Sequence, residues 1–221
     1  MRIAELSSRS GTSIPSIKFY LREGLLPSGE STGRNQAEYD DSHLHRLRLI
    51  RALIDVGGVS VSGARDVLAA VDTPDIAGHY LLGAAAYSLH RPGRRNADEP
   101  VWQEARTEVL ERIRERGWLI DEDAPQVDQA ADAVAAFRAL GQEDMLAMLP
   151  VYLDVAQQIA VQEVDLVISR AEPARMVEGV ITGTVLGEAL LNAFRRLGQQ
   201  DASARRLLSP DELATYTDRK V

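Results

Sequence analysis

The chain of 221 residues is predicted to be mainly α-helical, with one small β element near its N-terminus. Apolar residues recur every three or four positions through nearly the whole chain, and no stretch of alternating apolar and polar residues persists. The exception is Pro27–Ala37, a turn-forming segment rich in Gly and Ser. Asp72-Thr73-Pro74 then interrupts the helical pattern. We therefore expect a small N-terminal domain over residues 1–71, a short helix and linker over 72–100, and an all-helical domain over 101–221.

The first two predicted helices are short and lie on either side of a tight turn. The first helix covers about residues 3–8. Ser13 supplies an N-cap for the second, residues 14–23, because its hydroxyl can accept a hydrogen bond from the first turn. Pro15 falls in that first turn, where its missing N–H costs nothing. Gly24 is expected to end the helix.

Two more helices are predicted after the turn-rich segment. Asp40-Asp41-Ser42 provides capping side chains for a strongly amphipathic helix over residues 43–56. A further helix runs from Ser60 or Ser62 to about Val71. The buried face of the third helix is expected to contain Leu44, Leu47, Ile50, Leu53 and Ile54.

The order of these elements predicts a winged helix-turn-helix. In such a domain, two short strands flank the turn-rich segment and form the wing, and the second helix enters the major groove of DNA. The exposed face of this helix is expected to present Ser16, Lys18, Tyr20 and Arg22. Hydroxyl and cationic side chains of this kind contact phosphates and base edges.

Beyond residue 72 the pattern is helical throughout. A helix over 75–89 ends before Pro92-Gly93, which leaves it too short for a long coiled coil. The charged tail after Gln199 has a short helix after Ser209. Between these parts the sequence predicts helices over 102–116, 128–140, 144–170 and 174–198.

The composition excludes several classes of function. There is no Cys, which removes disulfides, thiolate metal sites and thiol redox chemistry. No catalytic arrangement, Gly-rich phosphate loop or metal-ligand spacing is present, so we expect no enzyme activity, no metal and no cofactor. The net charge is −8, but residues 1–71 carry +1 and residues 72–221 carry −9. The N-terminal part is therefore the one suited to phosphate.

The sequence also predicts a soluble, cytoplasmic protein. The N-terminus is polar and lacks the apolar core of a signal peptide. The longest apolar stretch, Met176–Leu191, is interrupted by Glu178 and Glu188 and is expected to be too short to cross a bilayer.

Two long segments carry a resemblance to a known family. They are RIAELSSRSGTSIPSIKFYLREGLLP at the N-terminus and EYDDSHLHRLRLIRALIDVGGVSVSGARDVL after the turn-rich segment. Their linked motifs include R-I-x-E-L, the G-x-S turn, the Phe19-Tyr20 pair, R-E-G-L-L-P and R-L-x-x-I-R. Over residues 1–71 the chain resembles the DNA-binding domain of the MerR family of bacterial regulators. The resemblance implies a homodimer on double-stranded promoter DNA that acts on RNA polymerase indirectly, by distorting the promoter spacer.

The resemblance also implies roles for individual residues. Ser13 would cap the recognition helix, Ser16 and Lys18 would contact bases and backbone, and Tyr20 would contact a phosphate. Arg34 and Asn35 would lie at the wing tip. Three positions depart from the family pattern, which predicts an atypical operator: Pro15 in place of a polar or basic residue, Phe19 in place of a tyrosine, and Asn35-Gln36-Ala37 in place of Gly-Tyr-Arg.

A glycine stripe marks the last long helix. Gly179, Gly183 and Gly187 are four residues apart and therefore share one face. Glycine lowers helix stability, so close approach of another helix is expected to compensate. The stripe fits either packing within the domain or a dimer seam.

The large side chains of the helical domain also have two interpretations. They form an ordinary core, or they line an apolar effector pocket, since Met and aromatic groups adapt to varied ligands. The acidic balance favours an apolar or cationic small molecule. The pocket candidates are Trp102, Trp118, Met148, Tyr152 and Phe194.

Two alternatives to an effector-controlled regulator remain open at this point. The helical domain could sequester a drug-like compound while the DNA-binding module is vestigial. Alternatively, the chain could be an architectural DNA-binding protein similar to an excisionase, although such proteins rarely need so large a helical domain.

Overall fold

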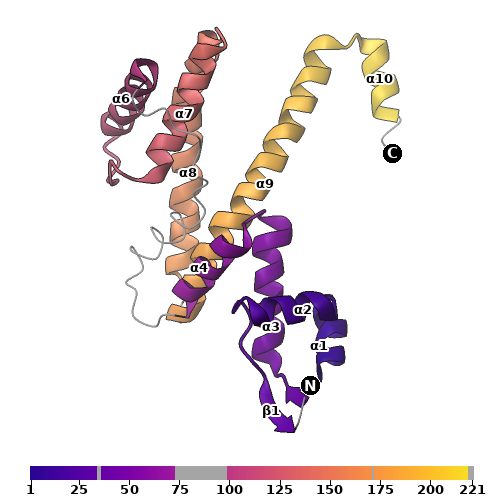
Figure 1. The fold of residues 1–221 in the computed structure, drawn as a ribbon. Helices are drawn as coiled ribbons and strands as arrows, with labels where there is room; N and C mark the ends of the chain where they lie inside the picture. Colours follow the sequence, from indigo (N-terminus) through magenta and orange to yellow (C-terminus); the bar gives the residue numbers. More distant parts are fainter. Residues whose placement is uncertain (34–35, 73–98, 171, 219–221) are drawn as a thin grey trace. The chain divides into compact units, whose positions relative to one another are not determined.

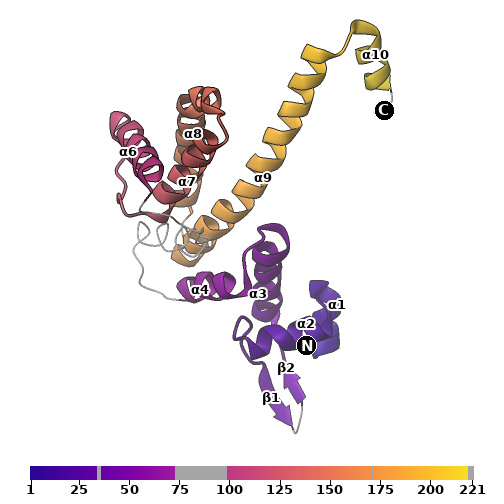
Figure 2. The same ribbon diagram turned by 45° about the horizontal axis from the view of Figure 1, so that its top comes forward.

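A computed structural model of the chain describes residues 1–33, 36–72, 99–170 and 172–218 (Figures 1 and 2). Its contacts divide the chain into two compact units. The first unit combines Met1–Val59 with Thr182–Val221, and the second is Ser60–Ile181. The expected domain boundary at residue 71 therefore stays a prediction, since the contacts group the residues differently.

The N-terminal elements confirm the predicted fold class of a winged helix-turn-helix followed by helices. Two helices precede an antiparallel hairpin, and a third follows it (Figure 1). In the hairpin, Glu30 pairs with Glu38 and Ser31 with Ala37, and a bulge before Gly33 shifts the register. The elements are α1 (Ile3–Ser10), α2 (Ile14–Arg22), β1 (Glu30–Gly33), β2 (Gln36–Glu38) and α3 (Asp41–Arg51), with a π-helical turn, η1 (Ala52–Val56), after α3.

The core of this module forms where the apolar faces of α1, α2 and α3 meet. Helix α1 packs against both α2 and α3. The chain turns sharply after α2 because Gly24 adopts a left-handed conformation with φ of 74°. This turn brings the next two leucines inward. The fully buried side chains are Leu6, Ile17, Leu25, Leu47, Ile50 and Leu53.

Polar side chains end these helices as the sequence predicted. The Ser13 hydroxyl accepts a hydrogen bond from the Ser16 N–H at the start of α2. At the C-terminus of α1, Arg51 donates a hydrogen bond from Nη1 to the Ser10 carbonyl oxygen at 3.0 Å. Gly11, with φ of 66°, leaves room there, because a Cβ at this position would lie 2.9 Å from Arg51 Nη1. The predicted third helix ends at Val56 as expected, but it begins earlier, at Asp41, and its last turn is π-helical.

Asp40 forms a capping box at the start of α3. Its carboxylate accepts hydrogen bonds from the Ser42 hydroxyl at 2.6 Å, the Ser42 N–H at 3.0 Å and the His43 N–H at 3.2 Å. The hydrogen bonds from Ser42, and then those from His43, hold the pKa of Asp40 well below its usual range. Its ionised form therefore stabilises the folded state.

We expect the Asp40→Ala variant to melt at a lower temperature than the wild type at pH 7. A carboxylate with a depressed folded pKa stabilises the protein above its unfolded pKa, near 3.9, and loses this effect as the pH falls through the folded pKa. The difference in melting temperature should therefore shrink below about pH 4. Thermal unfolding followed by circular dichroism from pH 7 to pH 2.5 measures it. A difference that stayed constant over this range would contradict the capping role of the ionised carboxylate.

The second unit has a compact core between two helices. Trp102, Ala105 and Val109 of α6 pack against Val127 and Ala131 of α7. The predicted helix 75–89 and most of the linker lie outside the described residues. The elements of this unit are α4 (Val61–Val71), α6 (Pro100–Glu115), α7 (Pro125–Ala139), a 3₁₀ helix, η2 (Glu143–Met148), and α8 (Leu149–Ile168).

Proline explains where the predicted boundaries of these helices were wrong. Both α6 and α7 start earlier than predicted, at Pro100 and Pro125, because a proline is well accommodated in the first turn. The single helix predicted over 144–170 is two elements instead. Pro150 lies in the first turn of α8, since it lacks the N–H that would continue the preceding 3₁₀ helix.

The last part of the chain is more helical than predicted. Helix α9 (Pro173–Leu207) continues well beyond residue 198, and an ion pair of 2.9 Å between Asp201 and Arg205, one turn apart, lies in this extension. The short helix predicted after Ser209 is confirmed as α10 (Pro210–Asp218), with Glu212 accepting a hydrogen bond from the Ser209 N–H.

Helix α9 is also long and apolar enough to cross a membrane, by length and composition alone. The expectation that this stretch is too short was therefore wrong, because the helix extends far past the apolar residues. One such helix is weak evidence for a membrane protein, since core helices of soluble proteins meet the same criteria.

Candidate nucleic-acid interface

The outer face of α2 presents three of the four polar residues predicted there; the prediction was wrong for Tyr20, which is buried. Lys18 is exposed, Ser16 is half-buried, and Arg22 points to solvent. The Ser13 and Ser16 hydroxyl oxygens are 2.8 Å apart, so these two side chains form one polar cluster at the N-terminus of the helix. Pro15 is exposed beside them and donates nothing.

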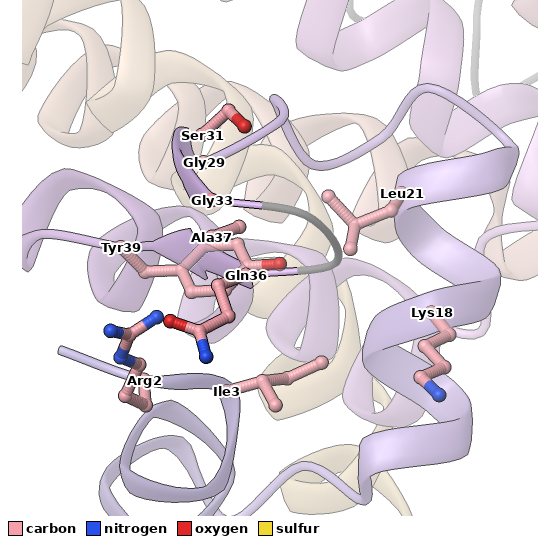
Figure 3. A pocket seen from close by; sticks show the side chains of 10 residues that line it. All are labelled: Arg2, Ile3, Lys18, Leu21, Gly29, Ser31, Gly33, Gln36, Ala37 and Tyr39. Atoms are coloured by element: carbon pink, nitrogen blue, oxygen red, sulfur yellow. The ribbon is translucent and has the colours of Figure 1, made fainter.

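An open hollow separates α2 from the wing (Figure 3). It has a volume of about 630 Å³. Lys18 and Leu21 of α2 lie on one side, and Gln36 and Tyr39 lie across from them (Figure 3). Arg2, Ile3, Ser31 and Ala37 complete most of the lining. A hollow that contains two cations and several hydrogen-bonding groups suits a phosphate backbone.

Arg2 is a residue of this hollow that the sequence did not reveal. Its Nη1 donates to the Thr32 hydroxyl at 3.2 Å, and its Nη2 lies 3.8 Å from the Glu38 carboxylate. The Tyr39 N–H donates to the Met1 carbonyl oxygen at 2.8 Å, which holds the start of the chain against the end of the wing. No local signal indicates this arrangement, because the interacting residues are separated by thirty positions or more.

Phe19 supports Arg22 on the exposed side of α2. The Arg22 guanidinium lies over the Phe19 ring, 5.3 Å from its centroid. This cation–π contact restricts the guanidinium, whose Nε also lies 3.5 Å from the Glu23 carboxylate. The replacement of a tyrosine by Phe19 thus removes a hydroxyl but leaves a platform for a cation.

Tyr20 lies mostly inside the module. Its side chain is 9% exposed, and its ring packs edge-on against Phe19 with centroids 5.7 Å apart. Burial raises the pKa of the Tyr20 hydroxyl, as does the nearby Asp55 carboxylate, while Arg51 lowers it. The hydroxyl is therefore neutral at physiological pH, and its contact with a phosphate stays a prediction. Arg34 and Asn35, predicted at the wing tip, lie outside the described residues.

The five pocket candidates are divided between the two compact units, so the effector pocket stays a prediction. Trp102 is a core residue whose Nε1 donates to Asp132 Oδ1 at 2.7 Å. Trp118 packs against the same cluster. Met148 and Tyr152 are exposed on η2 and α8. Phe194 is 66% exposed and belongs to the other compact unit. Among the residues that the structure describes, no group of His, Asp or Glu side chains could hold a metal ion.

The three glycines of α9 have different surroundings. A Cβ at Gly179 would collide with the Arg170 guanidinium, which donates to the Arg175 carbonyl oxygen at 2.9 Å. A Cβ at Gly183 would meet no atom within 4 Å. Gly187 is half-buried. The stripe therefore consists of one glycine packed against Arg170 and two half-buried glycines.

The fold and this interface define the class of protein: a winged helix-turn-helix DNA-binding module joined to a helical region. Comparisons with known proteins agree. Residues 1–71 match the family described as MerR HTH family regulatory protein. The crystal structure of "the putative transcriptional regulator SCO5550" from Streptomyces coelicolor A3(2) is 38% identical, with a TM-score of 0.69. That match covers 94% of this chain and 98% of the other. No curated protein matches the chain.

The chain belongs to the MerR family of transcription regulators and is a DNA-binding regulator. The family resemblance read from residues 1–71 is thereby confirmed. Membership in this family also indicates a soluble protein rather than one anchored through α9.

Proposed function

We propose that the chain is a cytoplasmic, homodimeric regulator that binds double-stranded promoter DNA through α2 and the wing and responds to a small-molecule effector. The observation that carries the DNA-binding part is the hollow between α2 and the wing, with Lys18 on one side and Arg2 on another. A phosphate backbone that follows this hollow places the outer face of α2 in the adjacent major groove.

Within this proposal the polar residues of α2 have distinct roles. Ser16 and Lys18 contact the DNA near the N-terminus of the helix, and Ser13 caps the helix and holds the Ser16 hydroxyl. Arg22 contacts a phosphate from its position over the Phe19 ring. Tyr20, Arg34 and Asn35 add contacts on the flanking backbone.

The Lys18→Ala variant tests the interface. We expect weaker binding to every duplex sequence, and a salt dependence whose log–log slope is smaller by about one unit, because one fewer phosphate is neutralised. Fluorescence anisotropy from 50 to 300 mM KCl, on a duplex selected by the wild type from a random library, gives both quantities. The matched control is Arg114→Ala on α6, which removes an exposed cation that is paired with Glu122. This variant should leave the slope unchanged. An unaltered slope for Lys18→Ala would exclude this groove as the phosphate site.

Homodimerisation follows from the way such modules read DNA. One module covers one half-site, and two half-sites related by a two-fold axis give the affinity and specificity that a regulator needs. Distortion of the promoter spacer by such a dimer would then act on RNA polymerase without direct contact.

The effector part of the proposal is supported by the apolar surface of the helical unit. Helix α8 exposes Val151, Tyr152 and Val155 along its N-terminal half, next to Met148 on η2. A surface of apolar and aromatic side chains in an acidic region suits an apolar or cationic compound. Quenching of tryptophan fluorescence by a lipophilic cation such as tetraphenylphosphonium tests this. Unchanged emission and melting temperature at saturating concentration would count against an effector of this class.

A further inference from the structure

Pro15 lies at the centre of the outward face of α2, in the first turn of the helix. Successive residues of an α-helix are about 100° apart, so Pro15 lies opposite the buried Ile17 and Tyr20. Lys18 and Arg22 follow it on the same exposed face. In a helix-turn-helix, the N-terminal residues of the second helix contact the base edges. Pro15 is therefore well placed to meet a base.

This end of α2 is poorly suited to hold a phosphate group. Helix N-termini bind anions through free N–H groups of the first turn. Pro15 has no N–H, and the Ser16 N–H donates to the Ser13 hydroxyl at 3.2 Å. The Ile17 N–H donates to the Ser13 carbonyl oxygen at 2.9 Å. The first turn therefore meets the DNA with side chains rather than with a set of backbone donors.

The serine hydroxyls beside Pro15 can serve any base pair. The Ser13 and Ser16 oxygens are 2.8 Å apart, so one hydroxyl hydrogen is shared between them and the other is free to donate. In the major groove, T·A presents a carbonyl oxygen and an amino group, and G·C presents the same two kinds of group. This pair of serines therefore adds affinity without choosing between the two base pairs.

Pro15 supplies the apolar surface that could make this choice. Within α2, all of whose residues the structure describes, it is the one apolar side chain that is exposed. The ring of Phe19 carries the Arg22 guanidinium, and Leu21 lines the hollow beside the wing. The C5-methyl group of thymine is recognised in the major groove by apolar side chains. A proline ring has almost no rotamer freedom to lose in such a contact.

We propose that Pro15 contacts the C5-methyl group of a thymine, so that one position of the operator favours a 5-methylated pyrimidine. The proposal rests on the placement of α2 in the major groove under the proposed function, and it adds the base that α2 selects. Pro15 thus changes the base that this position reads, in addition to removing a polar contact.

Replacing thymine by deoxyuridine tests the contact, because this change removes only the methyl group. Each thymine of a duplex selected by the wild type from a random library is replaced in turn, and affinity is measured by fluorescence anisotropy. At the contacted position the wild type should bind the uracil duplex about three- to fivefold more weakly, as expected for one methyl group left in water. Pro15→Ser should bind the thymine and uracil duplexes equally at that position.

The control is the same substitution at another exposed proline of the module. Pro27→Ser lies in the segment between α2 and the wing, and this variant should keep the wild-type preference for thymine. An equal preference in Pro15→Ser would assign the methyl contact to another residue and overturn the proposal. Circular dichroism checks that both variants fold. The uracil scan of the wild type decides even if Pro15→Ser does not fold, since discrimination at no position would exclude the contact.

Two outcomes separate this inference from the interface on which it rests. A wild type that binds the selected duplex tightly but ignores every uracil would overturn the role of Pro15 and leave the phosphate groove at Lys18 intact. A wild type that selects no duplex from the library would overturn both.

A methylated cytosine provides the reverse measurement. Replacing the contacted T·A pair by C·G should weaken binding, and 5-methylcytosine at the same place should recover about three- to fivefold, because its methyl group occupies the same position in the groove. Pro15→Ser should show no recovery. Equal binding of the cytosine and 5-methylcytosine duplexes by the wild type would show that another group of the thymine is read.

Discussion

The Leu47→Ala variant should lose a large part of the stability of the N-terminal module. Leu47 lies on α3, which packs against α1, and its side chain is fully buried. Removing three carbons leaves a cavity that the neighbouring side chains fill only partly, and such changes cost about 2–5 kcal/mol. This is a large fraction of the stability of a small domain, typically about 5–15 kcal/mol.

The loss should be visible in both folding and binding. Urea unfolding followed by circular dichroism should show the transition of this module at a lower urea concentration, with no change in the transition of the core of α6 and α7. DNA affinity should fall together with the folded fraction, because α2 is held in place by the same core. Arg48→Ala removes an exposed side chain of the same helix and should shift the urea midpoint little. An unchanged midpoint for Leu47→Ala would show that Leu47 is not a core residue.

The Trp102→Ala variant should have the largest effect in the helical unit. Trp102 is 8% exposed and contributes the largest side chain of the core between α6 and α7. Its replacement by Ala removes that buried surface. It also removes the indole N–H that donates a hydrogen bond to Asp132 Oδ1 at 2.7 Å. The expected cost is about 3–5 kcal/mol in the free energy of unfolding.

Trp102→Phe separates packing from hydrogen bonding. The phenyl ring retains most of the apolar contact but cannot donate, so the cost should be about 1–3 kcal/mol. The sequence has two tryptophans, so Trp118 becomes the single fluorophore in this variant and reports on unfolding of the same cluster. Tyr152→Ala, at a position that is 43% exposed, is the control. Equal midpoints for Trp102→Ala and Tyr152→Ala would contradict the placement of Trp102 in the core.

Local chemistry explains why much of the DNA-binding module could be predicted. Ser13 and Asp40 are good N-caps, and Gly24 is suited to a left-handed turn, whatever surrounds them. The helical period then places Ser16, Lys18 and Arg22 away from the buried Ile17. These inferences involve residues within a few positions of one another, and the structure confirms the elements that they predicted.

The same reasoning was less accurate at helix boundaries and over long distances. Pro100 and Pro125 begin helices rather than precede them. A proline is favoured in the first turn of a helix, although it also ends a helical pattern that comes before it. The expectation of an effector pocket that includes Trp102 and Phe194 relied on residue type alone and stays a prediction. Aromatic residues at helical spacing indicate burial, but which helices face one another depends on packing between distant segments.

The sequence by itself determined the order of the N-terminal elements, their capping and the family, because each depends on residues close together along the chain. Only the tertiary structure decided that Arg2 joins Lys18 at the hollow, because the wing must fold back onto α1 to bring them together. It also decided that Val185 of α9 packs beside Gly57, since a periodic pattern identifies an apolar stripe but not the surface that packs against it.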